Sequence, residues 1–111
     1  MIDCFIKSNN ELRRIDINEI YYFYKSDNKT IAVTKNSKIE MNIPLYSISS
    51  SLEKYSFFLR IHKSYIVNIH KIEKINKFNN RTYNLQFKGI EDIVYCTHKN
   101  LKILSDKLII I

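Results

Sequence analysis

The sequence predicts a mainly-β domain of antiparallel sheets with two short helices. Apolar and polar residues alternate in many short segments, which is the period of a strand with one buried face. The connections between these segments are short, and this favours antiparallel pairing because parallel strands need long crossovers. Two stretches, which begin at Pro44 and Thr97, instead space their apolar residues three and four apart, as on one face of a helix.

The chain is predicted to be one domain, residues 1–111, with a modest core. It is 45% hydrophobic and contains eight Tyr and six Phe, which indicates a globular rather than a disordered chain. Residues 1–4 do not begin a signal peptide, and no apolar run approaches the length of a membrane span. We therefore expect a cytoplasmic protein without membrane insertion.

Five strands are expected in the first half of the chain, separated by polar turns. The turn at 26–29 is the clearest, because Asp and Asn bond their own backbone and tolerate positive φ. In the strand that follows it, Ile31 and Val33 are expected to point inward. The expected strands are residues 5–7, 12–17, 20–25, 30–35 and 38–43.

The two expected helices begin at residues suited to a helix start. Pro44 fits a first helical turn, where its missing N–H is not needed, and the Thr97 hydroxyl can cap a helix. The run at 49–51 is all Ser, so the first helix must depend on packing. The apolar faces are Leu45, Ile48, Leu52 and Tyr55 in the helix over 44–55, and Leu101, Leu104 and Leu108 in the final helix.

Residues 57–69 are the centre of the predicted domain. Alternation over 59–62 predicts a strand, and its break at 63–64 predicts a turn or bulge that presents these two residues and His62 outward. Residues 65–67 are apolar on both faces, as expected of a strand buried on both sides. This stretch therefore holds basic and polar side chains on rigid backbone, which suits a recognition site.

The remaining residues are expected to form a helical turn near 69–72 and a further group of short strands. Asn79 and Asn80 fit a hairpin turn, since Asn accepts the left-handed conformation. Gly89 marks the next turn. The expected strands are residues 73–78, 82–88 and 93–96, with Tyr83, Leu85 and Phe87 pointing inward.

The net charge of +7 is unevenly distributed along the chain. Residues 1–59 hold 8 Lys or Arg against 7 Asp or Glu, whereas residues 60–111 hold 10 against 4. A basic half indicates a polyanionic partner, although a solvated surface that aids solubility has the same composition. Charge alone does not decide between these interpretations.

No catalytic or metal-binding pattern is present, so we expect neither an enzyme nor a cofactor. The histidines, His62, His70 and His98, do not have the spacing that places two ligands on one helix face. A chain with one glycine cannot form a glycine-rich phosphate loop. Cys4 and Cys96 are far apart in sequence, so we expect reduced, structural thiols, with redox sensing by Cys96 as the weaker alternative.

Basic and polar residues are concentrated in three turns or helix starts. Such side chains can bind phosphates, and Lys and Asn can also reach base edges. No expected helix has the length and basic face of a major-groove reader, so if DNA is read, loops must read it. The alternative from the residues alone is three ordinary solvated turns. The groups are Arg60, His62, Lys63 and Ser64; Thr97, Lys99, Asn100 and Lys102; and Asp27, Asn28 and Lys29.

The segment Phe-Phe-Leu-Arg-Ile-His-Lys-Ser-Tyr-Ile-Val-Asn at 57–68 resembles the signature of LytTR-type DNA-binding domains, the output modules of many bacterial response regulators. Residues 20–28 resemble the early aromatic strand and loop of that family, 44–55 its small helix, and 95–101 the start of its last helix. The resemblance covers about nine-tenths of the chain in the right order. It implies an elongated arrangement of small antiparallel sheets, with loops along one side that meet double-stranded DNA.

The resemblance also implies roles for individual residues. Base contacts are expected from Lys63, from Lys99 and from one residue of the turn at 27–29. Arg60 is expected to reach a phosphate. The remaining matched positions, implicated in DNA-backbone contacts or their support, are His62, Ser64, Tyr95, Thr97, Asn100 and Lys102.

Two departures from the family pattern bear on function. Many members have Arg where this chain has Lys63 and Lys99, and Lys lacks the two-pronged fork with which Arg reads guanine. We therefore expect weaker guanine discrimination and more reliance on phosphates and DNA shape. The chain also has no room for a receiver domain, so a receiver or a membrane partner protein would have to act from outside it.

The resemblance implies a sequence-specific double-stranded DNA-binding domain that regulates bacterial transcription, and we expect two copies on repeated half-sites. One alternative is a protein-interaction module with a basic surface, for which the apolar end at 108–111 is the best feature. A third is single-stranded RNA binding through tyrosines. It is the weaker one, because most of the tyrosines lie in apolar strand patterns that predict burial.

Overall fold

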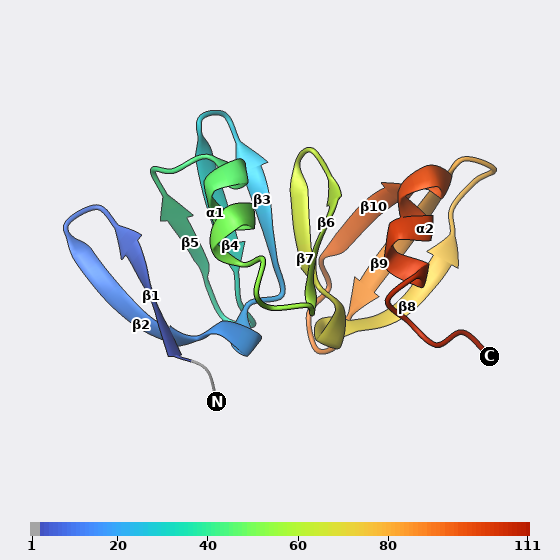
Figure 1. Ribbon diagram of the computed structural model, residues 1–111, viewed down its shortest axis with the longest axis horizontal. Coiled ribbons are helices and arrows are strands. Elements are labelled where there is room, and N and C mark those ends of the chain that lie inside the picture. Colours follow the sequence, from blue (N-terminus) through green and yellow to red (C-terminus); the bar gives the residue numbers. More distant parts are fainter. Residues whose placement is uncertain (1–2) are drawn as a thin grey trace.

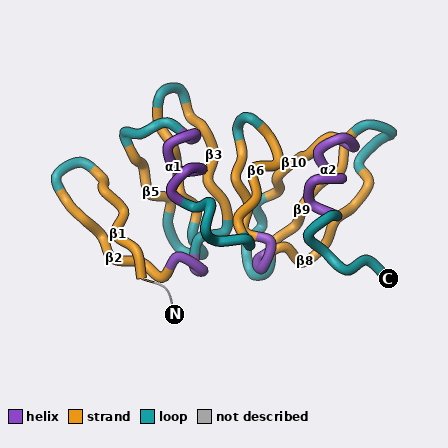
Figure 2. Tube along the Cα trace, viewed as in Figure 1, coloured by secondary structure: helices purple, strands orange, loops and turns teal. Residues whose placement is uncertain are grey.

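Three antiparallel sheets lie side by side in the computed structural model, which describes residues 3–111 (Figure 1). The molecule is elongated, with extents of 44 × 31 × 26 Å. Strands dominate the chain, and the helices are short (Figure 2). The predicted mainly-β architecture of small antiparallel sheets with two short α-helices is confirmed.

The first sheet is a hairpin of β1 (Asp3–Ser8) and β2 (Glu11–Asp16). Its turn is left-handed at Asn9, with φ of 54°, a conformation that Asn tolerates. The inward-facing Ile6 and Ile15 pack into the core of the central sheet. The single-turn 3-10 helix η1 (Ile17–Glu19) then leads into that sheet.

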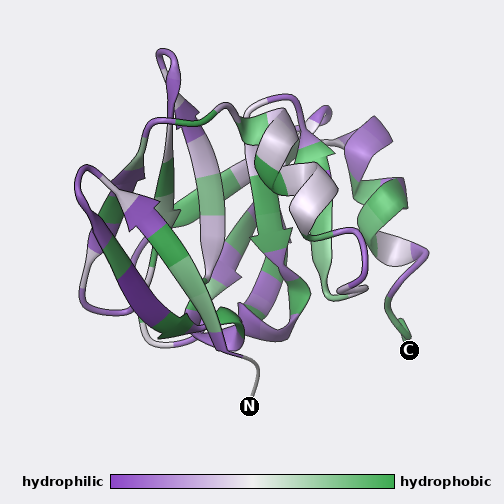
Figure 3. Cartoon of the chain, turned by 60° about the vertical axis from the view of Figure 1, so that its left-hand side comes forward, coloured by the Kyte–Doolittle hydropathy of each residue, from purple (hydrophilic) through white to green (hydrophobic). Residues whose placement is uncertain are grey.

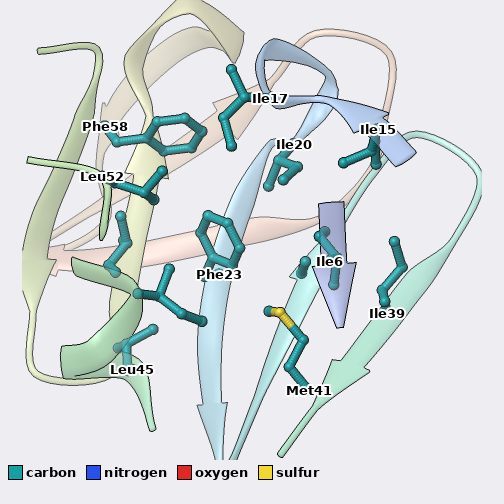
Figure 4. Packing of buried hydrophobic residues seen from close by; sticks show 13 residues of the cluster. Ile6, Ile15, Ile17, Ile20, Phe23, Ile39, Met41, Leu45, Leu52 and Phe58 are labelled. Carbon is teal, nitrogen blue, oxygen red and sulfur yellow. The ribbon is translucent and has the colours of Figure 1, made fainter. Parts of the chain in front are cut away.

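The central sheet has the strand order β5-β4-β3-β7-β6. Its opposite faces pack into two separate buried clusters, so its strands are apolar on both sides. Figure 4 shows the cluster that contains Phe23, Met41 and Phe58. Ile31 and Val33 of β4 point inward as expected, and Thr30 and Ala32 are fully buried on the other face. The strands are β3 (Tyr22–Ser26), β4 (Lys29–Val33), β5 (Lys38–Met41), β6 (Phe58–His62) and β7 (Tyr65–Asn68).

The helix α1 (Leu45–Ser51) covers one face of the central sheet and is shorter than predicted. Pro44 lies just outside it, as the N-cap with an extended ψ of 157°, rather than in the first turn. The serine run adds little helix propensity, so the helix ends at Ser51 and Leu52 is packed from the turn that follows. The predicted apolar face is nevertheless the buried one.

The third sheet has the strand order β10-β9-β8. It comprises β8 (Ile72–Lys77), β9 (Thr82–Phe87) and β10 (Ile93–Thr97), and follows the single-turn helix η2 (Ile69–Lys71). The helix α2 (His98–Ser105) packs against β6, β9 and β10. It ends three residues before Leu108, which still packs on the core.

Two tyrosine hydroxyls tie the central sheet to the β9–β10 loop. The Tyr21 hydroxyl donates to the Lys88 carbonyl oxygen at 2.6 Å, and the Tyr22 hydroxyl donates to Asp92 Oδ2 at 2.7 Å. The Tyr22 ring also stacks on Phe87, with ring centroids 5.3 Å apart. These contacts fix the position of the central sheet relative to the third sheet.

Alkaline pH should weaken the fold through Tyr22. Burial, followed by the hydrogen bond to Asp92, raises the pKa of Tyr22 above its ordinary value of 10.0. A raised native pKa contributes stability that is complete below the unfolded pKa and is lost as the pH rises above it. We expect Tyr22→Phe to lose about 1–2 kcal/mol of unfolding free energy near pH 8, and to show a smaller further loss between pH ~8 and ~11 than the parent chain in urea unfolding. Equal losses in both proteins would contradict this role.

Candidate nucleic-acid interface

The three polar groups predicted from sequence all lie along one edge of the molecule, at the top of Figure 1. We call this the loop edge and define it by the β3–β4 turn (27–28), the β6–β7 turn (63–64) and the start of α2 (97–100). The same edge stays uppermost in Figure 3, where its loops are largely hydrophilic. Segments far apart in the sequence therefore place polar residues along one edge of the molecule.

The β3–β4 turn is built around Asp27, whose φ of 55° is left-handed. Asp27 and Asn28 are both exposed at the tip. Lys29 begins β4 and forms an ion pair with Glu40 on β5, so its ammonium group is already partly engaged. Of the predicted pair Asn28 and Lys29, the structure leaves Asn28 as the more available side chain.

The β6–β7 turn is held by three hydrogen bonds that leave Lys63 exposed. Arg60 Nη2 donates to the Lys63 carbonyl oxygen at 2.9 Å, and the Ser64 N–H donates to His62 Nδ1 at 3.0 Å. The Lys25 N–H on β3 donates to the Ser64 carbonyl oxygen at 3.0 Å. The turn is therefore fixed both internally and to the neighbouring strand.

A register shift in β6 sets the direction of these side chains. Arg60 pairs with Ile66 but His62 pairs with Tyr65, so Ile61 is an extra residue in the strand. Ile61 is 1% exposed, and Arg60 is directed outward at the edge strand. Since His62 Nδ1 accepts a hydrogen bond, the neutral ring carries its proton on Nε2, which can donate to a phosphate.

The start of α2 presents the second predicted group. The Thr97 hydroxyl accepts from the Asn100 N–H at 3.1 Å, so the predicted cap is present. The His98 N–H donates to the Arg81 carbonyl oxygen at 2.9 Å, which joins the helix start to the β8–β9 turn. Lys99 and Lys102 are exposed and Asn100 is half-buried.

Tyr95 lies on the outer face of β10 and not in the core. It is 45% exposed and meets Phe78 edge to face, with ring centroids 5.4 Å apart. Since Thr97 follows two residues later on the same face of the strand, Tyr95 is placed next to the start of α2.

Acidic residues gather at the opposite edge of the sheets. Asp16 and Glu19 precede β3. Asp92 accepts a hydrogen bond from the hydroxyl of Tyr22, which is the first residue of β3. Glu91 lies in the same β9–β10 loop. Lys35 and Lys71 lie beside Glu19, and Lys35 and Lys38 lie beside Glu91 and Asp92, so the opposite edge carries charges of both signs.

Sequence reasoning did not single out Lys25, Tyr46 and Arg81, which the fold brings to the loop edge. Lys25 and Tyr46 line a groove together with residues of the β3–β4 and β6–β7 turns. Tyr46 follows the first residue of α1 and is 66% exposed. In the sequence, the one sign of this exposure is that Tyr46 lies off the predicted apolar face of the helix.

Other observations bear on the alternative functions. Cys96 is 2% exposed and burial raises the pKa of its thiol, which argues against redox sensing. Among the eight tyrosines, Tyr46 and Tyr95 are the large exposed ones, whereas Tyr21 and Tyr22 are buried. Leu108 packs on the core, but Ile109, Ile110 and Ile111 are exposed.

Within residues 3–111, no group of three or more His, Cys, Asp or Glu side chains is arranged to hold a metal ion. None of the helices in that range has the length and apolar character needed to cross a bilayer.

A mainly-β domain that gathers basic and polar loop residues on one edge has the build of a nucleic-acid-binding module. The chain belongs to the LytTr DNA-binding domain family, whose model matches residues 10–109. A solved LytTr DNA-binding domain from Bacillus cereus has the same fold, with a TM-score of 0.79, 18% identity and 96% coverage of both chains.

Two curated relatives illustrate the proteins in which similar segments occur. The transcriptional regulatory protein YpdB of Escherichia coli (strain K12) is 31% identical over 86 residues, which cover 78% of this chain and 35% of YpdB. An uncharacterized HTH-type transcriptional regulator of Staphylococcus aureus (strain NCTC 8325 / PS 47) is 28% identical over 98 residues, or 88% of this chain and 65% of the relative. The chain thus spans about a third of YpdB and about two-thirds of the staphylococcal regulator.

Proposed function

We propose that this chain binds double-stranded DNA sequence-specifically and regulates transcription, with its loop edge against the duplex. The observation that carries the proposal is the convergence of three rigidly held loop segments on one basic edge, in a chain that belongs to the LytTr DNA-binding domain family. Asn28, Lys63 and Lys99 would read base edges in major grooves, because each is exposed at the tip of its segment.

The other predicted residues would position the domain on the DNA backbone. The His62 ring, the hydroxyls of Ser64 and Tyr95, and the amide of Asn100 can donate to phosphate oxygens. Thr97 caps α2, so it would act mainly by directing the helix start, where the peptide dipoles favour an anion. The cationic members of the set are Lys29, Arg60 and Lys102.

The regulatory context extends the proposal beyond this chain. One small domain offers limited specificity, so two copies would occupy repeated half-sites. Because the chain matches only part of longer regulators, control would come from elsewhere in such a protein or its partners. A phosphorylated receiver domain or a membrane partner protein are the two candidates. The compartment that suits a DNA-binding regulator is the cytoplasm.

Binding should weaken steeply with salt. About six basic or polar groups in contact with phosphates predict a slope near −5 when log affinity is plotted against log salt concentration. Fluorescence anisotropy with a duplex of the preferred sequence, from ~50 to ~200 mM salt, measures this slope. A slope near zero would contradict a phosphate-dominated interface.

Lys99→Ala separates base reading from phosphate binding at the start of α2. If Lys99 reads a base, the substitution costs about 1–3 kcal/mol and relaxes the preference at one base pair. Lys107→Ala is a matched control, because Lys107 is exposed beyond the end of α2. A change in salt slope with an unaltered preferred site would assign Lys99 to a phosphate instead.

The proposal is tested by selecting the purified domain on a pool of randomised duplexes and sequencing the bound fraction. An enriched motif, especially a spaced repeat, is the expected result. Salt-sensitive retention without enrichment would reduce Lys63 and Lys99 to positioning contacts. Absence of retention at low salt would overturn DNA binding.

The exposed Ile109, Ile110 and Ile111 favour a second candidate function, a protein-interaction module. It would be supported if duplex DNA, single-stranded DNA and RNA, compared in a competition experiment at equal ionic strength, all failed to bind the domain. Preferential competition by single strands or RNA would instead support the tyrosine-based alternative.

A further inference from the structure

A groove on the loop edge lies between the β3–β4 turn, the start of α1 and the β6–β7 turn. Its cationic side chains are Lys25, Lys29, Arg60 and Lys63, and Asp27 is the carboxylate among the described residues that line it. Lys29 is paired with Glu40. The three remaining cations and Asp27 leave the groove with a net charge of about +2.

The walls of the groove are held in place by hydrogen bonds between segments. The Lys25 N–H donates to the Ser64 carbonyl oxygen at 3.0 Å, which joins β3 to the β6–β7 turn. The fully buried Thr30 hydroxyl donates to the Ile43 carbonyl oxygen at 2.8 Å, which fixes the approach to α1. The groove is therefore pre-organised, and a ligand would pay little to order it.

Tyr46 forms part of one wall, and the packing of the core does not account for it. Its neighbours Leu45 and Ile48 are buried, whereas Tyr46 is 66% exposed. Pro44 and Leu45 line the groove beside it. An exposed aromatic ring with a hydroxyl next to three unpaired cations matches the chemistry of a phosphodiester, which offers acceptor oxygens and one negative charge.

We propose that this groove seats one phosphate group of a DNA strand, and that Lys25 and Tyr46 contact it. The inference rests on the proposed function and adds two contact residues to it. Lys25 supplies positive charge from β3, and the Tyr46 hydroxyl donates a hydrogen bond from the start of α1. Arg60 uses one nitrogen to hold the Lys63 carbonyl oxygen and has its remaining donors for the same phosphate.

Seating a phosphate here would also set the register of the base-reading residues. Asn28 and Lys63 line the same groove as Lys25 and Tyr46. A backbone phosphate fixed between the two turns therefore places both tips over the adjacent major groove. The phosphate contacts that position the domain on the duplex and the base contacts that recognise the DNA sequence would then come from one rigid unit.

The test pairs protein variants with duplexes that carry a single neutral methylphosphonate at successive positions of the preferred site. The variants are Lys25→Gln, which removes a charge, and Tyr46→Phe, which removes a hydroxyl. Lys54→Gln is the control, since Lys54 is exposed beyond the far end of α1. All three side chains are exposed, so we expect the fold to be retained, and circular dichroism checks this.

One methylphosphonate position is expected to lower the affinity of the parent chain about tenfold, the effect of losing a charged hydrogen bond. Lys25→Gln should lower affinity for the unmodified duplex by a similar factor and reduce the salt slope by about 1. Its affinity should fall no further when the duplex carries the methylphosphonate at that position. Tyr46→Phe should show the same non-additivity more weakly, and Lys54→Gln should be additive at every position.

Additive losses for Lys25→Gln at every methylphosphonate would overturn the inference while leaving DNA binding intact. A parent chain that binds no duplex would instead overturn the proposed function. Inorganic phosphate, titrated at constant ionic strength, tests for a free anion. Saturable shifts of the Lys25 and Tyr46 NMR signals without DNA would assign the groove to that anion and overturn its assignment to a DNA strand.

Discussion

Asn68→Asp is expected to cost about 3–5 kcal/mol of unfolding free energy, because it buries an unpaired charge. Asn68 is fully buried at the end of β7. Its Nδ2 donates to the Ile20 carbonyl oxygen at 2.9 Å and to Asn18 Oδ1 at 3.0 Å, while its Oδ1 accepts from the His70 N–H at 2.9 Å. A carboxylate of the same shape keeps the last bond but turns its second oxygen toward two other oxygens.

Urea unfolding near pH 7 measures this effect, and Asn76→Asp is the matched control. Asn76 is exposed on the edge strand β8, so the same chemical change there should stay within about 0.5 kcal/mol. Acidification should restore part of the stability of the Asn68 variant, because a protonated carboxyl can again donate. Similar losses for both substitutions would show that the buried amide does not organise this junction.

Asn68 also illustrates what the sequence could and could not predict. The turn at 63–64 follows from the break in alternation and the strand 65–67 from its continuous apolar run, and the structure confirms both. The role of the following Asn depends on carbonyl oxygens about 50 residues earlier in the chain. No local pattern reports a partner at that separation.

The burial of Thr30 was unpredictable for a similar reason. Alternation in β4 correctly indicated that Ile31 and Val33 point inward, but it places the polar Thr30, just before Ile31, on the opposite face, which the pattern gives no reason to bury. The structure covers that face with α1 and the first hairpin, and the Ile43 carbonyl oxygen satisfies the hydroxyl. Whether a strand is covered on one face or both depends on distant segments, which a window of a few residues does not contain.

The candidate interface divides in the same way. The cap at Thr97 and the turns at 27–28 and 63–64 follow from the chemistry of neighbouring residues, so they could be predicted. The groove that joins Lys25 and Tyr46 to Lys63 is formed by three separate segments, so it could not.

Leu104→Ala is expected to cost about 2–5 kcal/mol of unfolding free energy and to weaken DNA binding as well. Leu104 is fully buried in α2, which packs against β6, β9 and β10. A helix of eight residues is not stable alone, so this packing is what holds the helix in place. Loosening it would release the start of α2, where Lys99 and Asn100 lie.

The adjacent Ile103→Ala separates packing from helix propensity. Ile103 is 44% exposed in the same helix, so its substitution should cost less than about 1 kcal/mol and leave DNA affinity nearly unchanged. Urea unfolding measures stability, amide hydrogen exchange in α2 measures local opening, and anisotropy measures binding at a temperature where both variants are folded. If the Leu104 variant opened α2 yet kept its affinity and salt slope, the start of α2 would lie outside the DNA interface. If it lost affinity in proportion to that opening, ordered presentation of this helix start would be a requirement for binding.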